Sequence, residues 1–187
     1  MKTKEILSMV MEELKDTFST LDEEQLDKLQ ESILEANKIL VAGAGRSLMM
    51  IRGFAMRLMH MGFVAYVVGE TVTPAIEKGD LLIIASGSGA TGTLTVIAEK
   101  CKRIGADLAL ITTKTDSPIG KLADFVLEVK AATTKVENNK KHSIQPGANT
   151  FEQSVLLIGD AIIINLMSFR ALTESNIVLM TKHANLE

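Results

Sequence analysis

Five short apolar runs, separated by longer segments with helical spacing, constrain the fold of this chain more than any other feature. The runs are KILVAG (38–43), VAYVV (64–68), DLLIIAS (80–86), ADLALIT (106–112) and DFVLEV (124–129). Each is apolar at successive residues rather than at alternate ones, which is typical of strands buried on both faces. Helices expected between them, over about 46–61 and 91–104, indicate right-handed crossovers. The sequence therefore predicts an α/β fold, a three-layer α/β/α sandwich around a five-stranded parallel sheet.

Two amphipathic helices are expected before the first strand. Residues 4–18 carry apolar side chains at helical spacing. A second helix is predicted to begin in TLDE, where Thr20 and Glu23 have the spacing of a capping box, and to end near Ala36. Both helices precede every segment that carries candidate chemistry.

Three further segments complete the prediction. SPIGKLAD predicts a short helix, with Ser117 as its N-cap and Pro118 at its first position. The polar stretch 131–150 is long for a loop in a compact domain, which is typical of a functional or mobile segment. An apolar helix is expected from Phe151 to about Leu172, followed by a short helical piece that ends in TKHANLE.

The chain length favours one domain rather than two, because 187 residues suit a single large core. We expect one domain over 1–187, made of an N-terminal helical extension (1–37) and an α/β core with C-terminal helices (38–187). No repeat or low-complexity tract divides it.

Composition and charge narrow the possible partners. The net charge is −3 and no long Lys/Arg block is present, which disfavours a nucleic-acid partner. The N-terminus lacks the features of a signal peptide, and Asp160 and Asn165 interrupt the most apolar late stretch. We therefore expect no membrane partner and a cytoplasmic location. The single cysteine, Cys101, excludes an internal disulfide and is predicted to be a buried small hydrophobe.

Two glycine-rich turns each follow a strand and open a helix: VAGAGRS after the first run and IASGSGAT after the third. A helix N-terminus offers free N–H groups and a positive partial charge, which favour an anion. Glycine permits close approach, and hydroxyl groups donate without adding charge. Because ligands bind beyond the carboxyl ends of parallel strands, we expect Ser47, Ser86, Ser88 and Thr91 to bind a phosphate monoester.

Other interpretations of these turns remain open at this point. They are also compatible with ordinary strand-to-helix turns that carry Ser and Thr caps. A dinucleotide fingerprint would need glycine in place of Leu48, and no GK[ST] of a P-loop is present. With three histidines at these spacings, no histidine-rich metal site is expected.

Several segments resemble one enzyme family. GAGRS, RLMHMGF, VGETVTP, GDLLIIASGSGAT, SPIGKLAD, FEQ and HANLE are similar to segments of the 6-phospho-3-hexuloisomerases, within the sugar isomerase (SIS) domain group. The resemblance runs from about Ile39 to Glu187. The Ser-x-Ser-Gly-x-Thr turn marks only the wider phosphosugar-binding group, whereas RLMHMGF, VGETVTP and HANLE point to this branch.

The resemblance implies an SIS, flavodoxin-like fold and an isomerase that interconverts D-arabino-hex-3-ulose 6-phosphate and D-fructose 6-phosphate. In that family this reaction is the second step of formaldehyde fixation through ribulose monophosphate. The resemblance also implies a homotetramer built from dimers, with no metal or organic cofactor. Two alternatives are another SIS isomerase, of the arabinose 5-phosphate type, and a phosphosugar-sensing domain. A sensor would need the phosphate turn but no catalytic base, and the first 38 residues contain no basic recognition helix.

The reaction needs a general base, a group that polarises the sugar oxygens and a phosphate anchor. Glu152 is the predicted base, because it lies where a polar loop meets an apolar helix and matches the presumed base of the SIS isomerases. A simpler interpretation is an acid in a first helical turn, favoured by the helix dipole. Arg46 is expected to bind the phosphate or an enediolate oxygen, or else to form a surface ion pair.

The remaining candidates have smaller roles. Gly45, Gly87 and Gly89 are expected to bind substrate through the backbone of the two turns. Glu70 is a weaker base candidate that can instead bind a sugar hydroxyl. His183 is predicted to enter a neighbouring subunit's active site, although a loose chain end is the simpler interpretation. We expect a structural role for His60 at the end of its helix and a solvated side chain for His142.

Overall fold

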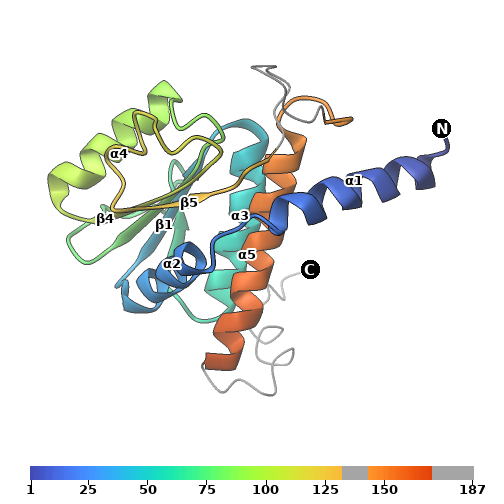
Figure 1. Cartoon of the computed structure of the whole chain (residues 1–187). Helices are drawn as coiled ribbons and strands as arrows, with labels where there is room; N and C mark the ends of the chain where they lie inside the picture. The colour runs from blue at the N-terminus through green and yellow to red at the C-terminus, as the bar shows by residue number, and fades with distance from the viewer. Residues whose placement is uncertain (132–142, 170–187) are drawn as a thin grey trace.

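The computed structural model describes residues 1–131 and 143–169. Its elements (Figure 1) are α1 (Thr3–Phe18), α2 (Glu23–Glu35), β1 (Ile39–Gly43), α3 (Gly45–His60), β2 (Ala65–Val67), β3 (Leu81–Ala85), α4 (Gly92–Ile104), β4 (Asp107–Thr112), β5 (Phe125–Glu128) and α5 (Asn149–Phe169). The five strands lie within the apolar runs that predicted them, and the predicted α/β class is confirmed.

The five strands form one parallel sheet in the order β2-β1-β3-β4-β5. Ile39 of β1 is paired with Ala65 on one side and with Leu81 on the other. The chain therefore leaves β1 in one direction to form β2 and then crosses back to form β3. This strand order is the flavodoxin-like one, in which ligands bind where the direction of winding changes. That switch point lies between β1 and β3.

Two apolar cores cover the two faces of the sheet. On one face α2, α3 and α5 pack against alternate residues of the strands, among them Val41 and Ile83. On the other face α4 packs against the remaining alternate residues, among them Leu40 and Ile84. The predicted three-layer sandwich is confirmed, with most of its helical cover on the face that α5 shares.

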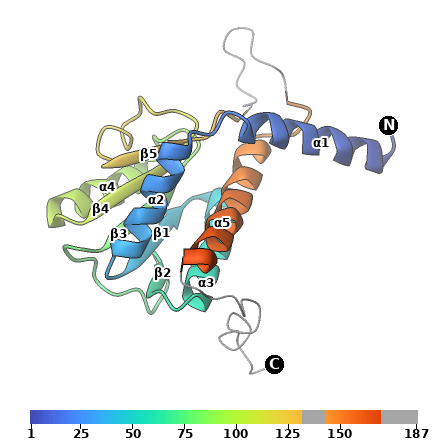
Figure 2. The ribbon, with the colours of Figure 1, turned by 60° about the horizontal axis from the view of Figure 1, so that its bottom comes forward.

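The first helix does not lie on the sheet. In both views α1 projects away from the rest of the molecule (Figures 1 and 2), and its main helical neighbour is α5. Four of its large apolar side chains are exposed: Ile6, Leu7, Met9 and Met11. This helix therefore leaves part of its apolar surface uncovered by the described chain.

The N-cap predicted for α2 is wrong. Asp22, not Thr20, caps this helix, because its side chain accepts a hydrogen bond from the backbone N–H of Glu24 at 2.9 Å. The Thr20 hydroxyl instead donates to the carbonyl of Thr17 at 2.7 Å and so closes the end of α1. Each side chain satisfies the helix end that is nearer to it.

The short helix predicted in SPIGKLAD is also wrong, because the structure has turns there. The hydroxyl of Ser117 does accept from the N–H of Gly120 at 3.1 Å, as a cap would. However, the N–H of Ile119 donates to the carbonyl of Gly89 at 3.0 Å, outside the segment. Within the segment, the N–H of Lys121 donates to the carbonyl of Ser117 at 3.0 Å, so the chain forms successive turns that a tertiary bond ties to the β3–α4 loop.

The long apolar helix, α5, begins two residues before Phe151 and is described to Phe169. Residues beyond it, including the predicted terminal helical piece, lie outside the described residues. By length and composition alone, Asn149–Ser168 is apolar enough to cross a membrane, with a mean hydropathy of 1.3. Half of that stretch is buried inside the protein, as in the core helix of a globular domain.

Cys101 and His60 are both buried in the fold. Cys101 is a free thiol packed in the α4 core, which confirms the predicted small hydrophobe. His60 is buried in the last turn of α3. An α-helix rises 1.5 Å per residue, so His60 lies roughly 22 Å along α3 from Gly45. His60 is therefore far from the turn that opens α3.

Candidate functional site

The first glycine-rich turn joins β1 to α3 at the switch point. Its backbone needs glycine, because a Cβ on Gly43 would lie 2.9 Å from the backbone nitrogen of Leu48. Gly45 has φ +55°, a left-handed conformation that glycine adopts readily. The N-cap residue, Ala44, provides no side-chain cap. The first N–H groups of α3 are therefore left for an external acceptor.

The second turn, Ser86–Thr91, joins β3 to α4 at the same edge of the sheet. Ser86 is buried and its Oγ lies 3.5 Å from Oγ1 of Thr91. Ser88 is exposed, and its Oγ accepts from the N–H of Ala90 at 3.2 Å. Thr91 is the N-cap of α4 but makes no side-chain cap bond. The turn thus gathers three hydroxyl groups at an uncapped helix N-terminus.

Neighbouring residues hold this second turn in place through its carbonyl groups. The carbonyl of Gly87 accepts from the backbone N–H and the hydroxyl of Thr113, at 3.1 and 2.8 Å, and from the hydroxyl of Thr112 at 3.1 Å. Gly89 has φ +59°, and a Cβ there would lie 2.1 Å from Oγ of Ser117. The turn is therefore a fixed structure that only glycine allows at that position.

The first turn of α5 lies against the second glycine-rich turn. A Cβ on Gly87 would lie 3.3 Å from Cδ1 of Phe151, whose side chain is completely buried. This close approach brings the residue after Phe151, Glu152, to the edge of the sheet that carries both turns. The sequence prediction that Glu152 and the two turns share one site is consistent with this packing.

Arg46 and Glu152 form an ion pair across the site. Nε of Arg46 lies 2.8 Å from Oε2 of Glu152. The Glu152 side chain is only 14% exposed, whereas that of Arg46 is 52% exposed. Within the described chain Oε2 accepts no hydrogen bond, so the guanidinium approaches it without aiming an N–H at it. The pair places a cation and a partly buried carboxylate, which can accept a proton, at the same point.

Glu70 forms a separate ion pair in the structure. Glu70 is paired with Arg52 of α3, and both side chains are about half exposed. Within the described part of the chain, no hydrogen bond or ion pair joins Glu70 to Arg46, to Glu152 or to the second turn. His183 lies outside the described residues, as does His142, so the roles predicted for them stay predictions.

Sequence reasoning gave no role to Gln153, although it is part of the FEQ motif. Its Oε1 is buried and has no hydrogen-bond partner among the described residues. A buried acceptor without a donor is unfavourable by about 1–3 kcal/mol. Gln153 is therefore a buried polar residue of the FEQ motif whose acceptor has no donor among the described residues.

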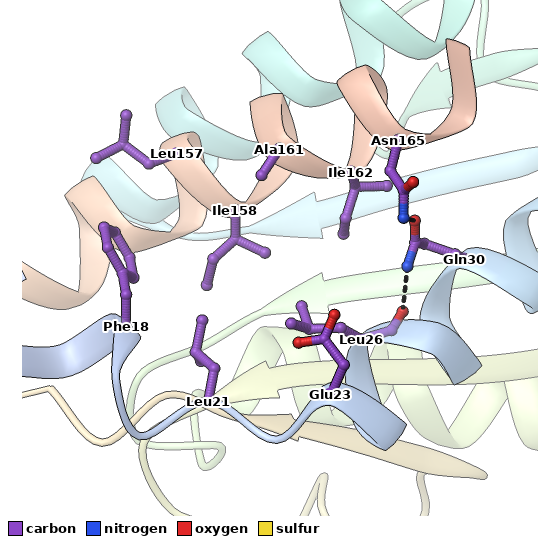
Figure 3. Close-up of a pocket in the computed structure, with 10 residues that line it drawn as sticks. All are labelled: Phe18, Leu21, Glu23, Leu26, Gln30, Leu157, Ile158, Ala161, Ile162 and Asn165. Atoms are coloured by element: carbon purple, nitrogen blue, oxygen red, sulfur yellow. Dashed lines mark hydrogen bonds between the residues drawn. The ribbon is translucent and has the colours of Figure 1, made fainter. Parts of the chain in front are cut away.

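The apolar cavity shown in Figure 3 is separate from this site. It has a volume of about 480 Å³ and lies between α5 and the junction of α1 and α2. At one end Nδ2 of Asn165 donates to Oε1 of Gln30 at 2.7 Å. Neither glycine-rich turn lines it, and its lining residues are Phe18, Leu21, Glu23, Leu26, Gln30, Leu157, Ile158, Ala161, Ile162 and Asn165. Its apolar lining does not suit a phosphate.

No group of three or more His, Cys, Asp or Glu side chains among the described residues is arranged to hold a metal ion. The ionisable groups of the candidate site are Arg46 and Glu152, which lie beside the hydroxyl-rich turn. Its chemistry combines an anion-binding edge with one carboxylate that can exchange a proton.

Comparisons with known proteins agree on one family. The SIS domain model matches residues 32–162. The chain is 42% identical to the 3-hexulose-6-phosphate isomerase of Bacillus subtilis (strain 168), with all of both chains covered. It is 41% identical to the 3-hexulose-6-phosphate isomerase of Mycobacterium gastri, covering 97% of this chain and 89% of that protein. A solved structure of a hypothetical protein from Methanococcus jannaschii, from which a function of 3-hexulose-6-phosphate isomerase was inferred, matches with TM-score 0.84 and 36% identity over 98% of this chain and 99% of that one.

Proposed function

The chain belongs to the SIS domain family and, within it, to the 3-hexulose-6-phosphate isomerases, and from this premise we propose how its site interconverts D-arabino-hex-3-ulose 6-phosphate and D-fructose 6-phosphate. The observation that carries the mechanism is the pair of Arg46 and Glu152 beside two phosphate-type turns. The reaction belongs to the ribulose monophosphate pathway of formaldehyde fixation, in which it is the second step.

The two glycine-rich turns anchor the substrate phosphate in this proposal. The uncapped N-termini of α3 and α4 supply backbone N–H groups, including those near Gly45, Ser47 and Gly89. Ser86, Ser88 and Thr91 add hydroxyl donors. Binding the phosphate, which does not react, holds the sugar carbons in line with the base and so lowers the entropy that the reaction must lose.

Glu152 moves the proton in this mechanism. The shared intermediate is the 2,3-enediol(ate), which is reached from the hexulose by loss of the C2 proton and from fructose 6-phosphate by loss of the C3 proton. From the hexulose, Glu152 takes the C2 proton, the electrons of that C–H bond form the C2–C3 double bond, and the C3 carbonyl oxygen gains the negative charge. The hydroxyl proton on O2 then passes to O3, the same carboxyl group returns its proton to C3, and the C2–O bond becomes the carbonyl.

Arg46 stabilises the charge that develops on oxygen. The guanidinium already lies at ion-pair distance from Glu152, so it is close to the atoms whose charge changes. When the proton moves to Glu152, the negative charge leaves the carboxylate and appears on the enediolate oxygen. A cation that is fixed next to both positions stabilises the transition state without having to reorganise.

The same proposal includes a homo-oligomer, which we take to be a tetramer, in the cytoplasm. Support for assembly comes from the projecting α1, whose exposed Ile6, Leu7, Met9 and Met11 would lose water contact against a second copy. Support for the location comes from the substrate, because a charged phosphate ester does not cross a membrane unaided. We also propose that His183 helps to complete the active site of a neighbouring subunit.

A coupled assay tests the proposed function. Hexulose 6-phosphate is supplied by a separate synthase from formaldehyde and ribulose 5-phosphate, and fructose 6-phosphate is detected through phosphoglucose isomerase and glucose 6-phosphate dehydrogenase as NADPH. We expect NADPH formation that depends on the purified protein and that Glu152→Gln slows by roughly 10²–10⁴-fold. Arabinose 5-phosphate serves as the alternative substrate. Turnover of arabinose 5-phosphate without turnover of the hexulose would overturn the proposal.

A further inference from the structure

A glutamate of the projecting helix is bonded to the segment that leads into α5. Oε2 of Glu13 accepts from the hydroxyl of Ser143 at 2.7 Å and from Nε2 of Gln145 at 3.1 Å. Its Oε1 accepts from the N–H of Ile144 at 2.9 Å. The hydroxyl of Thr150 lies 3.3 Å from Oε2 and donates to it. One carboxylate therefore accepts from four groups more than a hundred residues away in the chain.

This network is built into the first turn of α5. Gln145 and Thr150 are both buried, and Nε2 of Gln145 also donates to the hydroxyl oxygen of Thr150 at 3.1 Å. One turn later, the hydroxyl of Ser154 donates to the carbonyl of Thr150 at 2.6 Å. Thr150 precedes Glu152 by two residues, so the bonds of Glu13 end within the helical turn that carries the carboxylate of the site.

The segment before α5 depends on these side-chain bonds for its position. Residues 143–148 contain no helix or strand, so no regular ladder of backbone hydrogen bonds fixes them. Glu13 supplies acceptors to three of the residues in 143–150 through their side chains. A carboxylate is also favourable close to the N-terminus of a helix, where the backbone dipole is positive.

We propose that Glu13 is a positioning residue for the isomerisation: it holds the first turn of α5 in place and so keeps Glu152 beside Arg46 and the substrate carbons. The inference rests on the proposed role of Glu152 as the base. Proton transfer requires the base within hydrogen-bond reach of the carbon-bound proton. A shift of about 1 Å in such a group lowers the rate by roughly a hundredfold.

Glu13 is placed to affect the chemical step but not the binding of the substrate phosphate. Among the residues that the structure describes, no hydrogen bond or ion pair joins Glu13 to either glycine-rich turn, and bonds from Thr112 and Thr113 hold the second turn. Loss of Glu13 should therefore misplace the base while the phosphate anchor stays intact. The expected signature is a lower kcat at nearly constant KM.

Kinetics of Glu13→Ala test the inference, with Glu12→Ala as the matched control. Glu12 is the preceding residue on the same helix, is mostly exposed and, in the described ranges 1–131 and 143–169, pairs only with Lys15 at 3.8 Å. We expect kcat of Glu13→Ala to fall by roughly 10- to 100-fold, with KM changed by less than about threefold. Glu13→Gln keeps one acceptor oxygen and should lose less. Glu12→Ala should match the parent protein in both constants.

Thr150→Val tests the same hydrogen-bond network if Glu13→Ala does not fold. It removes the hydroxyl that donates to Glu13 but keeps the shape of the side chain, so it should lower kcat in the same direction. Where both variants fold, their effects on kcat should be less than additive, because they break one network. The mass of each variant is measured by light scattering, because Glu13 lies on α1, whose exposed apolar side chains are proposed to contact a second copy. This measurement shows whether a variant has lost the oligomer.

Three results would overturn the inference: an unchanged kcat in Glu13→Ala, an unchanged kcat in Thr150→Val when the first variant is unfolded, or a fall in kcat that accompanies loss of the oligomer. The activity of the parent protein in the same assay distinguishes failure of this inference from failure of the proposed function. An inactive parent would refute the isomerase itself. An active parent with fully active Glu13 variants would refute only the positioning role.

Discussion

Nε of Arg46, in the first turn of α3, lies 2.8 Å from Oε2 of Glu152, in the first turn of α5. The two helices pack against each other on the same face of the sheet. The guanidinium is the more exposed partner, so a substrate oxygen can approach it while the carboxylate stays partly buried. The pair therefore joins a charge-stabilising group to a proton-transfer group before any substrate arrives.

The first prediction concerns the guanidinium. Arg46→Met removes the cation next to the developing enediolate, and loss of one such stabilising group typically lowers kcat by roughly 10²–10³-fold. Arg46→Lys keeps the charge but not the planar geometry, so we expect a smaller loss. Both constants are measured in the coupled assay. Arg52→Met is the matched control, because Arg52 lies on the same helix and pairs with Glu70 instead. Equal losses in the two methionine variants would contradict the assignment.

The second prediction concerns the hydroxyl groups of the β3–α4 turn. A hydrogen bond to a charged group contributes about 1.5–3 kcal/mol, so Ser88→Ala should raise KM by roughly 10- to 100-fold and change kcat much less. Ser86→Ala should act in the same direction. Ser32→Ala, which removes an exposed hydroxyl bonded within α2, serves as the control. If neither loop variant alters the affinity for sugar phosphates, the phosphate does not bind there.

Local pattern was sufficient to predict the sheet and its two turns. The strands were predictable because continuous apolar runs such as DLLIIAS are typical of parallel strands that are buried on both faces. The turns were predictable because glycine is needed where the backbone comes close, as at Gly43, and its position after a strand places it at the ligand-binding edge. Both signals lie within a few residues of sequence.

Tertiary contacts decided what the sequence did not reveal. Ser117 has good capping chemistry, yet Ile119 bonds to Gly89, and no local pattern announces that bond. Glu13 looks like one acid among several in an amphipathic helix. Its partners lie some 130 residues further on, so only the folded chain identifies it. The ion pair of Arg46 and Glu152 was likewise unpredictable in its geometry, although both residues were candidates.

The third prediction concerns stability at low pH. Partial burial alone would raise the pKa of Glu13, but hydrogen bonds from Ile144, Ser143, Gln145 and Thr150 outweigh it and lower the pKa below its ordinary value of 4.5. The carboxylate therefore adds stability at pH values above 4.5, and this contribution is lost as the pH falls through the lowered pKa. All four donors are neutral groups, so their own titration does not mask the effect.

Thermal unfolding measures this dependence. Glu13→Gln should have a lower Tm than the parent protein at about pH 7, and the gap should narrow when both are compared at about pH 3. Other carboxyl groups titrate in the same range, but they are common to the two proteins and cancel in the difference. A gap in Tm that is the same at both pH values would show that the charge of Glu13 contributes nothing.

The fourth prediction concerns the thiol of Cys101. Burial is the main cause that raises its pKa, to about 11, and the thiol is packed within the α4 core. Since the thiolate is the reactive form, the native protein should react with a disulfide reagent at about pH 8 orders of magnitude more slowly than a free cysteine does. The same protein unfolded in guanidinium chloride should react at the ordinary rate. Rapid labelling under native conditions would contradict the buried position.

The last prediction concerns Glu152, on which the mechanism depends. Glu152→Gln keeps the size of the side chain and an oxygen that faces Arg46, but its amide cannot accept the carbon-bound proton. Loss of a positioned general base typically lowers the rate by 10²–10⁴-fold, and we expect a fall in kcat of roughly that size with little change in KM. Exchange of the C2 proton of the hexulose with solvent deuterium, followed by NMR, should stop as well. Because this exchange needs the base but not completed turnover, it separates loss of proton transfer from slow product release. Exchange that persists in Glu152→Gln would move the base to another group, with Glu70 and His183 as the next residues to replace.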